Sequence, residues 1–226
     1  MTRLSIAVII PALNEADCIG RLVAAIPRPL VERVVVVDNG STDRTADVAR
    51  AAGAQVIAQT RRGYGNACAA GIQAARAADV LVFMDGDLSD DPAELPRMLA
   101  PILDAQADLV LGTRTQVERG ALTPQQVLGN RVALSLLALL LHTRLSDLPS
   151  FKAVRRTTLE RLDLREHTYG WTTELLVKAI RQRVRIVEVP THYRRRGGGR
   201  SKVAGTWRGT LGAGYHMLRV VLRYAL

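Results

Sequence analysis

The sequence predicts an α/β fold with a mostly parallel central sheet and helices on both of its faces. In the first half of the 226 residues, short apolar runs alternate with alanine-rich stretches of helical spacing, an order typical of βαβ units. Right-handed crossovers between parallel strands place helices on both faces of such a sheet. With 48% hydrophobic and 23% charged residues, the composition is that of an ordinary globular domain.

The first half contains five strand candidates and four helix candidates. The expected strands are residues 4–10, 33–37, 55–58, 80–84 and 109–111, and the expected helices are residues 15–26, 42–52, 65–77 and 92–103. Thr42, followed by Thr45 and Asp47, is a typical helix start, and Gly53 is a typical stop.

The second half has a less regular pattern. We expect helices at 124–142, 171–181 and 206–225, strands at 151–154 and 184–189, and a Gly/Arg-rich loop at 194–202. The chain is expected to form one domain over residues 1–226, with parts at 1–115, 116–204 and 205–226. The longest apolar stretch is about ten residues, whereas a spanning helix needs about 20, so no membrane span is expected.

The late helices at 124–142 and 206–225 are C-terminal elements with an apolar or amphipathic pattern. The final one places Arg208, Arg219 and Arg223 near one side and leucines on another. A basic amphipathic helix can lie in an anionic membrane interface. The alternative is that both helices pack onto the domain or onto a second subunit, as in a homodimer.

The net charge of +10 points to nucleic acid, phosphorylated substrates or an anionic membrane surface. Nucleic-acid binding predicts interleaved aromatic residues, and aromatic residues are only 4% of this chain. Two cysteines, Cys18 and Cys68, make a disulfide framework unexpected and fit a reducing, cytoplasmic compartment.

The triplet Asp85-Gly86-Asp87 directly follows the apolar run at 80–84. Ligands bind at the carboxyl edge of the strands in open α/β sheets. Two carboxylates at that edge can hold one hard divalent cation, with a substrate phosphate completing its ligands. The triplet therefore predicts a metal site.

Two further polar segments follow the first and second strands. They contain Pro11, Leu13, Asn14 and Glu15, and Asp38, Asn39, Gly40 and Ser41. Turns and helix caps use the same residue types. However, three polar strand ends on one edge favour a binding site, in which a carboxylate can accept hydrogen bonds from a nucleobase or ribose.

Two glycine- and arginine-containing segments are candidates for anion binding. The first contains Arg62, Gly63 and Asn66 before a helix, where glycines allow close approach and the helix start favours anions. The second contains Arg196, Ser201 and Lys202, whose cationic groups could stabilise a departing diphosphate. The alternatives are solvated charge runs or, for the second segment, a nucleic-acid patch.

Asp147 and Glu174 are the late carboxylates of interest, within segments 146–152 and 169–174. The alternative for Glu174 is a first-turn acid that the helix dipole favours. A positioned carboxylate can act as a general base toward a hydroxyl group, whereas a phosphate group is bound by cationic side chains.

In combination, these motifs resemble glycosyltransferase family 2 with the nucleotide-diphospho-sugar transferase (GT-A) fold, and within it the dolichol- or polyprenyl-phosphate sugar synthases. The resemblance extends from Ile9 to about Gly212. Asn39 replaces the family's second acid, and Ser89 stands where a glutamine often provides a further metal ligand. The segment Asp147–Lys152 matches the family's acceptor motif without its glycine, and the motif of Arg196, Gly199, Ser201 and Lys202 is intact.

The resemblance implies an inverting, metal-dependent transfer of a sugar from a nucleotide-diphospho-sugar, with Mg²⁺ or Mn²⁺ on Asp85 and Asp87. A polyprenyl-phosphate acceptor is the leading hypothesis and a soluble hydroxyl acceptor the second; a nucleotidyltransferase is the competing enzyme class. Implied nucleotide-sugar-binding residues are those of the segments above, namely Pro11, Leu13, Asn14, Glu15, Asp38, Asn39, Gly40, Ser41, Arg62, Gly63, Asn66, Asp85, Gly86, Asp87, Arg196, Ser201 and Lys202. Implied acceptor-binding residues are Arg114, Arg131, Asp147, Ser150, Lys152, Trp171 and Glu174. Implied catalytic residues are Asp87, Glu174, Arg196 and Lys202.

Overall fold

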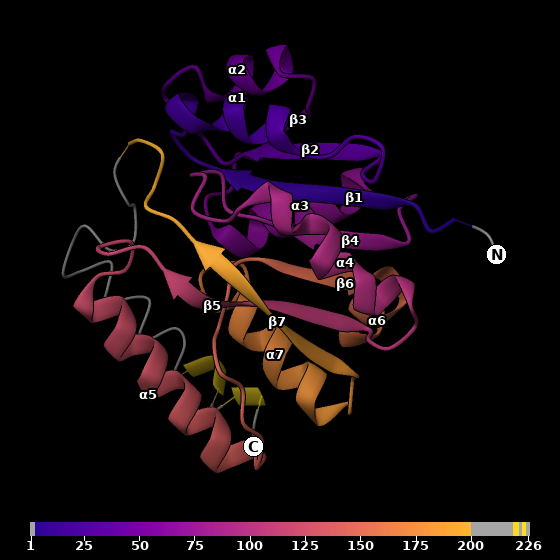
Figure 1. The fold of residues 1–226 in the computed structure, drawn as a ribbon, viewed down its shortest axis with the longest axis vertical. Helices are drawn as coiled ribbons and strands as arrows, with labels where there is room; N and C mark the ends of the chain where they lie inside the picture. The colour runs from indigo at the N-terminus through magenta and orange to yellow at the C-terminus, as the bar shows by residue number, and fades with distance from the viewer. Residues whose placement is uncertain (1–2, 200–218, 222, 225–226) are drawn as a thin grey trace.

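The structure, a computed structural model, describes residues 3–199, 219–221 and 223–224. Within these residues, one seven-stranded sheet has the order β3-β2-β1-β4-β6-β5-β7 (Figure 1). Its strands are β1 Ile6–Ala12, β2 Arg33–Asp38, β3 Gln55–Ala58, β4 Val80–Phe83, β5 Leu109–Val117, β6 Lys152–Arg155 and β7 Ile186–Tyr193. The sheet is mostly parallel, as predicted.

Helices cover both faces of the sheet, which confirms the predicted α/β layering (Figure 1). They are α1 Ala16–Ala25, α2 Thr45–Ala51, α3 Tyr64–Ala74, the 3₁₀ turn η1 Pro92–Glu94, α4 Leu95–Leu103, α5 Pro124–Leu141, α6 Arg156–Leu162 and α7 Trp171–Arg181. Alternate residues of β1 belong to different core clusters: Val8 packs with α1, α2 and α4, whereas Ile9 packs with α3, α6 and α7. This period of two is what a strand buried on both faces requires.

The strand β6 is the exception to the parallel arrangement. It pairs antiparallel with β4 on one side and β5 on the other, so the sheet joins the two halves of the chain. Because β6 runs in the opposite direction, it begins at the edge where β4 ends, with Lys152 opposite Phe83. The segment before β6 is thereby brought to the acidic triplet after β4.

Some boundaries differ from the sequence predictions. The strand β5 continues to Val117, and β7 continues past Pro190 to Tyr193. Proline lacks the N–H that a central strand needs, and β7 tolerates it because it lies at the sheet edge. The short helix α6 was not predicted.

The helix α5 lies on the outside of the molecule and packs mainly against α7 (Figure 1). Only Ala133 and Leu137 among its residues are fully buried. Leu137 packs with Val177 of α7 and with Val221. The predicted helix 206–225 is helical at 219–221 and 223–224, and its other residues lie outside the described part of the chain. No helix within the described residues is long and apolar enough to cross a membrane.

Candidate active site

The acidic triplet lies at the carboxyl edge of the sheet, directly after β4. Asp87 is 7% exposed, and its Oδ1 accepts hydrogen bonds from the Ser89 hydroxyl at 2.5 Å and the Ser89 N–H at 3.0 Å. Ser89 therefore orients Asp87, although its position in the family motif suggests a metal ligand. The pKa of Asp85 is raised mainly by its burial and also by the negative charge of Asp87. A cation at this edge would offset that crowding of negative charge.

Asp90 is a site residue that the sequence analysis missed. It is 3% exposed, and its Oδ2 accepts hydrogen bonds from the Asp85 N–H and the Ser150 hydroxyl, both at 3.2 Å. Burial and the charge of Asp85 raise the pKa of Asp90. Its neighbour Asp91 instead accepts a bond from the Ala93 N–H at the start of η1. Nothing in the sequence distinguishes the buried aspartate from the capping one.

Arg196 extends from the loop after β7 onto the acidic edge. Its Nη1 lies 2.7 Å from Asp87 Oδ2, and its Nη2 donates to both carboxylate oxygens of Glu15 at 2.7 Å. The Gly197 N–H donates to the Asp87 carbonyl at 2.8 Å. The structure thus joins three residues predicted from separate motifs. Ser201 and Lys202 lie outside the described residues.

The polar segments after β1 and β2 interlock at the same edge. Pro11 pairs in register with Val37, so both segments begin at one level. The Asn14 N–H donates to Ser41 Oγ at 2.9 Å, the Thr42 N–H donates to Asn14 Oδ1 at 2.7 Å, and the Ser41 N–H donates to Asp38 Oδ1 at 2.9 Å. Turns and helix caps would make these same contacts. Several residues of the two segments nevertheless remain partly exposed at the edge, namely Pro11, Leu13, Asp38, Gly40 and Ser41.

Asn39 has a structural role that the sequence analysis did not predict. Its side-chain amide donates to the carbonyls of Gln59 at 3.1 Å and Arg61 at 2.8 Å, and its Oδ1 accepts from the Gly63 N–H at 2.7 Å. An aspartate cannot donate the first two bonds. The asparagine here therefore braces the loop after β3, and the predicted contact of its side chain with a nucleotide is not supported.

The glycines at the start of α3 accommodate protein backbone, and not the ligand that we predicted. A Cβ on Gly63 would lie 2.3 Å from the carbonyl oxygen of His167, and one on Gly65 would lie 2.1 Å from that of Glu166. The Asn66 N–H donates to the His167 carbonyl at 3.0 Å. The predicted anion site at Gly63 and Asn66 is thus filled by the segment before α7. Arg62 does reach the edge, where Nη2 donates to the Gly40 carbonyl at 3.2 Å.

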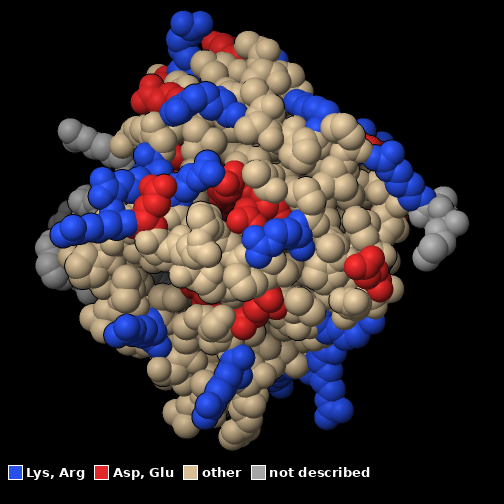
Figure 2. Space-filling view, viewed as in Figure 1, with Lys and Arg blue, Asp and Glu red and all other residues tan. Residues whose placement is uncertain are grey.

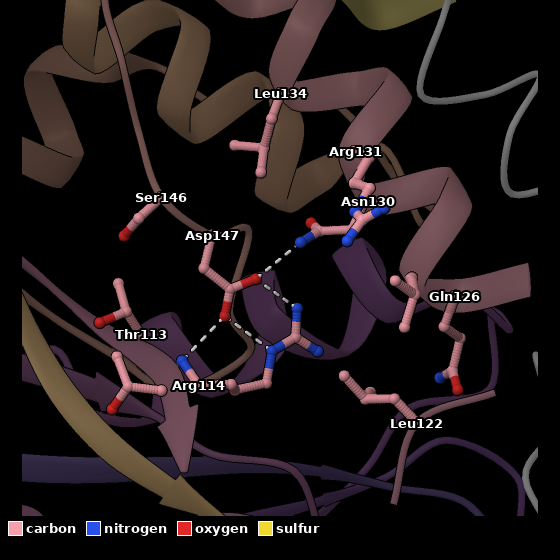
Figure 3. A pocket seen from close by; sticks show the side chains of 11 residues that line it. Thr113, Arg114, Leu122, Gln126, Asn130, Arg131, Leu134, Ser146 and Asp147 are labelled. Atoms are coloured by element: carbon pink, nitrogen blue, oxygen red, sulfur yellow. Dashed lines mark hydrogen bonds and ion pairs between the residues drawn. The ribbon is translucent and has the colours of Figure 1, made fainter. Parts of the chain in front are cut away.

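A cavity of about 230 Å³ lies between the end of β5 and the first half of α5. Figure 3 shows Asp147 at its polar end, between Arg114 and Asn130. Asp147 accepts from Arg114 Nε at 2.7 Å, from Arg114 Nη2 at 2.5 Å and from Asn130 Nδ2 at 2.9 Å. Burial by itself would raise the pKa of Asp147, but the Arg114 guanidinium holds this pKa below its usual value. The antiparallel entry into β6 places Asp147 here.

The other walls of the cavity combine polar residues (Thr113, Thr115, Gln126 and Ser146) with apolar ones, and the cavity adjoins a second hollow. Leu122, Val127 and Leu134 line the cavity, together with the exposed Arg131 (Figure 3). The second hollow is lined by Leu122, Pro124, Val127, Leu128 and Arg131, so the two spaces share residues. The combined surface has a cationic and polar end and an apolar extension along α5.

Two of the predicted acceptor-binding residues, Lys152 and Trp171, are buried within the core and do not line the cavity, which argues against the predicted contacts. Trp171 is 2% exposed and packs against Phe83, with ring centroids 4.9 Å apart. Lys152 is fully buried; its Nζ donates to Thr172 Oγ1 at 3.2 Å, and burial lowers its pKa. These side chains support the edge from beneath, where an acceptor cannot contact them. The residue type of Lys152 gave no signal of burial, since lysine is usually exposed.

Glu174, predicted as both a catalytic and an acceptor-binding residue, is also fully buried. Its carboxylate accepts the N–H groups of Arg165, at 2.9 Å and 3.0 Å to its two oxygens, and of Glu166 at 2.7 Å, and it pairs with Lys178 at 2.6 Å. These bonds fix the segment that packs on the start of α3. A carboxylate so enclosed cannot take a proton from a bound substrate, so the geometry favours a positioning role.

The carboxylates of Asp85 and Asp87 fit a hard divalent cation, because carboxylate oxygens are the ligands that Mg²⁺ and Mn²⁺ prefer. Among the described residues, no three acidic, histidine or cysteine side chains form a complete metal site. A cation here would therefore need oxygens from a bound phosphate, as is usual for Mg²⁺.

The fold, with acidic residues at the carboxyl edge of its mostly parallel sheet, defines the class of the GT-A glycosyltransferases. The family model described as glycosyl transferase family 2 matches residues 7–162, and the chain belongs to this family. An uncharacterized glycosyltransferase of Mycobacterium tuberculosis is 39% identical over 211 residues, covering 92% of this chain and 93% of the relative.

Two further likenesses concern proteins with named activities. The undecaprenyl-phosphate mannosyltransferase of Micrococcus luteus is 34% identical over 216 residues, covering 87% of this chain and 86% of that protein. The glucosyl-3-phosphoglycerate synthase of Mycobacterium tuberculosis, solved with Mn²⁺, UDP-glucose and phosphoglyceric acid, has a TM-score of 0.80 and 26% identity, covering 98% of this chain and 80% of that one. The same synthase has also been solved with Mg²⁺ and UDP.

Proposed function

We propose that the enzyme transfers a sugar, with inversion, from a nucleotide-diphospho-sugar to a polyprenyl phosphate, and that Asp85 and Asp87 hold Mg²⁺ or Mn²⁺. The observation that carries the acceptor assignment is the cavity beside the acidic edge. It has arginine side chains at its polar end and leucine and valine side chains along its extension. An anionic head on an apolar chain has the matching pattern.

On the donor side, we assign the nucleotide to the partly exposed edge formed after β1 and β2. Asp38 and Ser41 can bond to hydroxyl and base groups, and Arg62 lies beside Gly40. The diphosphate is assigned to the acidic triplet and Arg196. The UDP and Mn²⁺ of the solved glucosyl-3-phosphoglycerate synthase support the donor class.

The chemistry follows from the charges of the groups. A phosphate oxygen of the acceptor attacks the anomeric carbon, the bond from that carbon to the diphosphate oxygen breaks, and a nucleoside diphosphate leaves. A bound divalent cation supplies stabilisation of the charge that develops on the leaving group. Because the acceptor phosphate is already an anion, no carboxylate base is needed, which agrees with the enclosed position of Glu174.

On the acceptor side, we assign the main role to Arg131. Arg114 is already bonded to Asp147, so it presents a fixed and partly neutralised guanidinium. Arg131 is exposed and borders both hollows. We therefore assign the acceptor phosphate to Arg131, with Arg114 as an oriented neighbour and Ser150 at the boundary with the donor side.

A small soluble acceptor is the second candidate. The cavity volume of about 230 Å³ suits a compact phosphorylated molecule, and the glucosyl-3-phosphoglycerate synthase was solved with phosphoglyceric acid. The likeness to the undecaprenyl-phosphate mannosyltransferase and the apolar extension of the cavity favour the lipid.

A lipid acceptor requires contact with a membrane, and α5 is the element that we assign to it. Leu128 and Leu139 are 64% and 70% exposed, and the sequence of α5 contains no acidic residue. We propose that the enzyme is cytoplasmic and binds peripherally to the inner membrane face; a homodimer through α5 is the alternative occupant of that surface. Co-sedimentation with anionic vesicles and analytical ultracentrifugation distinguish the two.

The basic side chains elsewhere do not form one continuous patch on the face viewed in Figure 2. Lys and Arg side chains are spread over that face and alternate with acidic ones. Such an arrangement gives little support to the phosphate-tracking surface that a nucleic-acid partner would need.

The test is a transfer assay with Mn²⁺ and labelled UDP- and GDP-sugars, offering a short-chain polyprenyl phosphate or phosphoglycerate as acceptor. We expect label to enter the lipid fraction. Arg131→Gln should raise the acceptor KM by about tenfold or more, because a hydrogen bond to a charged group contributes about 1.5–3 kcal/mol. Arg119→Gln, which removes the same charge outside the cavity, should leave KM unchanged. Transfer to phosphoglycerate and none to lipid would contradict the acceptor assignment.

A further inference from the structure

Arg196 holds the position at the acidic edge where a cation is expected. One of its nitrogens lies 2.7 Å from Asp87 Oδ2, and another donates to both oxygens of Glu15. The Arg196 side chain is 25% exposed, and the side chains of Glu15 and Asp87 are each 9% exposed. A guanidinium thus neutralises the same carboxylate that the proposed function assigns to a divalent cation.

The position of Arg196 is fixed by its backbone neighbours. The Gly197 N–H donates to the Asp87 carbonyl at 2.8 Å, and Arg21 Nη2 donates to the Gly197 carbonyl at 2.9 Å. The other oxygen of Asp87 is already engaged by Ser89. One carboxylate oxygen of Asp87 is therefore paired with the Arg196 guanidinium, and the other accepts a hydrogen bond from the Ser89 hydroxyl. A divalent cation that binds Asp87 must compete with both groups. Repulsion between such charges is poorly screened in a buried site.

We propose that Arg196 is the resident cation of the metal site, and that a divalent cation replaces it only together with a nucleotide diphosphate. The inference rests on the proposed function, because it takes Asp87 as a metal ligand. The diphosphate offers the guanidinium a bidentate anionic partner, which releases Asp87. The free enzyme then binds the metal weakly, and metal and nucleotide each strengthen the binding of the other.

The experiment is a titration with Mn²⁺, followed by the electron paramagnetic resonance signal of free Mn²⁺, with no nucleotide and with saturating UDP or GDP. Arg196→Gln should bind Mn²⁺ alone about tenfold more tightly than the wild type, within the usual range of coupling between sites. In the presence of the nucleotide it should bind Mn²⁺ more weakly than the wild type. This reversal of sign is not expected from a merely structural change.

The matched control is Arg195→Gln, which removes an equal charge from the adjacent position. The Arg195 side chain donates to the Arg119 carbonyl, so its loss should leave the Mn²⁺ affinity of the free enzyme unchanged. Thermal unfolding establishes that each variant is folded. The inference is overturned if Arg196→Gln binds Mn²⁺ alone no more tightly than the wild type, or if the control tightens binding equally.

The double variant Asp85→Asn with Asp87→Asn separates this inference from the proposed function. Loss of Mn²⁺ binding in that variant supports the metal site whatever Arg196 does. Binding of Mn²⁺ as tight as that of the wild type would overturn the metal assignment and the role of Arg196 together.

Discussion

Two arginine–carboxylate pairs lie at the same edge of the sheet and are held in different ways. Arg114 and Asp147 are enclosed between β5 and α5, where Asn130 and the backbone N–H groups of Arg114 and Leu148 complete the bonding of the carboxylate. Arg196 and Asp87 meet across the end of a loop, and the arginine is shared with Glu15. The first pair builds the cavity wall, whereas the second is placed to exchange partners.

The two pairs differ in burial, and burial determines how much stability is lost when one partner is removed. The side chains of Arg114 and Asp147 are 14% and 8% exposed, whereas that of Arg196 is 25% exposed. When one partner of a buried pair is removed, the other remains desolvated and unpaired, which is strongly destabilising. A partner with access to water can be rehydrated at little cost. We therefore expect the first pair to control stability and the second to control catalysis.

The largest expected effect is on catalysis and comes from the acidic triplet, which contributes Asp87 to the exchangeable pair. Replacing Asp85 and Asp87 together by asparagine should lower kcat for donor turnover by about 10³-fold, because the stabilisation of the leaving diphosphate is lost. Release of nucleoside diphosphate in the presence of Mn²⁺ measures the effect. Asp91→Asn is the matched control, since Asp91 caps η1 and pairs with Arg194. Equal activity of the double variant and the wild type would contradict the site.

The second effect is on stability and comes from the enclosed pair. Asp147→Asn should lower the free energy of unfolding by about 3 kcal/mol, because Arg114 loses its charged partner in a largely buried position. Asp87→Asn should lower it by less than about 1 kcal/mol, since Arg196 can turn toward water or remain with Glu15. Urea unfolding of both variants gives the comparison directly. If the two costs were the same, the distinction between a fixed and an exchangeable pair would be lost.

Much of the edge could be predicted because parallel strands with apolar runs end where polar residues begin. Asp85, Asp38 and Asn14 were placed correctly at one edge by that logic alone. The direction of β6 could not be predicted, because four apolar and basic residues carry no signal for parallel or antiparallel pairing. Yet that direction brings Asp147 and Ser150 to the site.

The burial of polar side chains was the other feature that could not be predicted from the sequence. Lys152 and Glu174 have residue types that are usually exposed, and both are fully buried because partners far along the chain or in neighbouring loops satisfy them. Gly63 and Gly65 have the composition of a ligand loop, but they serve the approach of another backbone segment. Such partners are visible only once the fold brings them together.

Asn39 is a neutral polar residue at the donor edge, and its contribution to stability can be compared with that of Asp147. Asn39→Asp restores the acid of the family motif but places a carboxylate against the carbonyls of Gln59 and Arg61. We expect the free energy of unfolding to fall by about 2 kcal/mol, because two donors are lost and a buried acceptor faces acceptors. The reverse exchange next to it, Asp38→Asn, keeps the oxygen that accepts the Ser41 N–H and should cost less than about 1 kcal/mol. Urea unfolding measures both, and a neutral Asn39→Asp would show that the loop can rearrange.

The smallest expected effect is a change with pH in the stability that Asp147 contributes. The folded protein holds the pKa of this carboxyl below its ordinary value, despite burial, through Arg114. A depressed folded-state pKa means that the stabilisation is fully present above the unfolded pKa of about 3.9. It is lost as the pH falls from there through the folded-state pKa. The difference in unfolding free energy between the wild type and Asp147→Asn should therefore be constant near neutrality and shrink below about pH 4. Asp79 and Asp108 also have lowered pKa values, but they are common to both proteins and cancel in the difference. A difference that stayed constant into acid would mean that Arg114 and Asp147 are not coupled through charge, and the enclosed pair would then differ from the exchangeable one in packing alone.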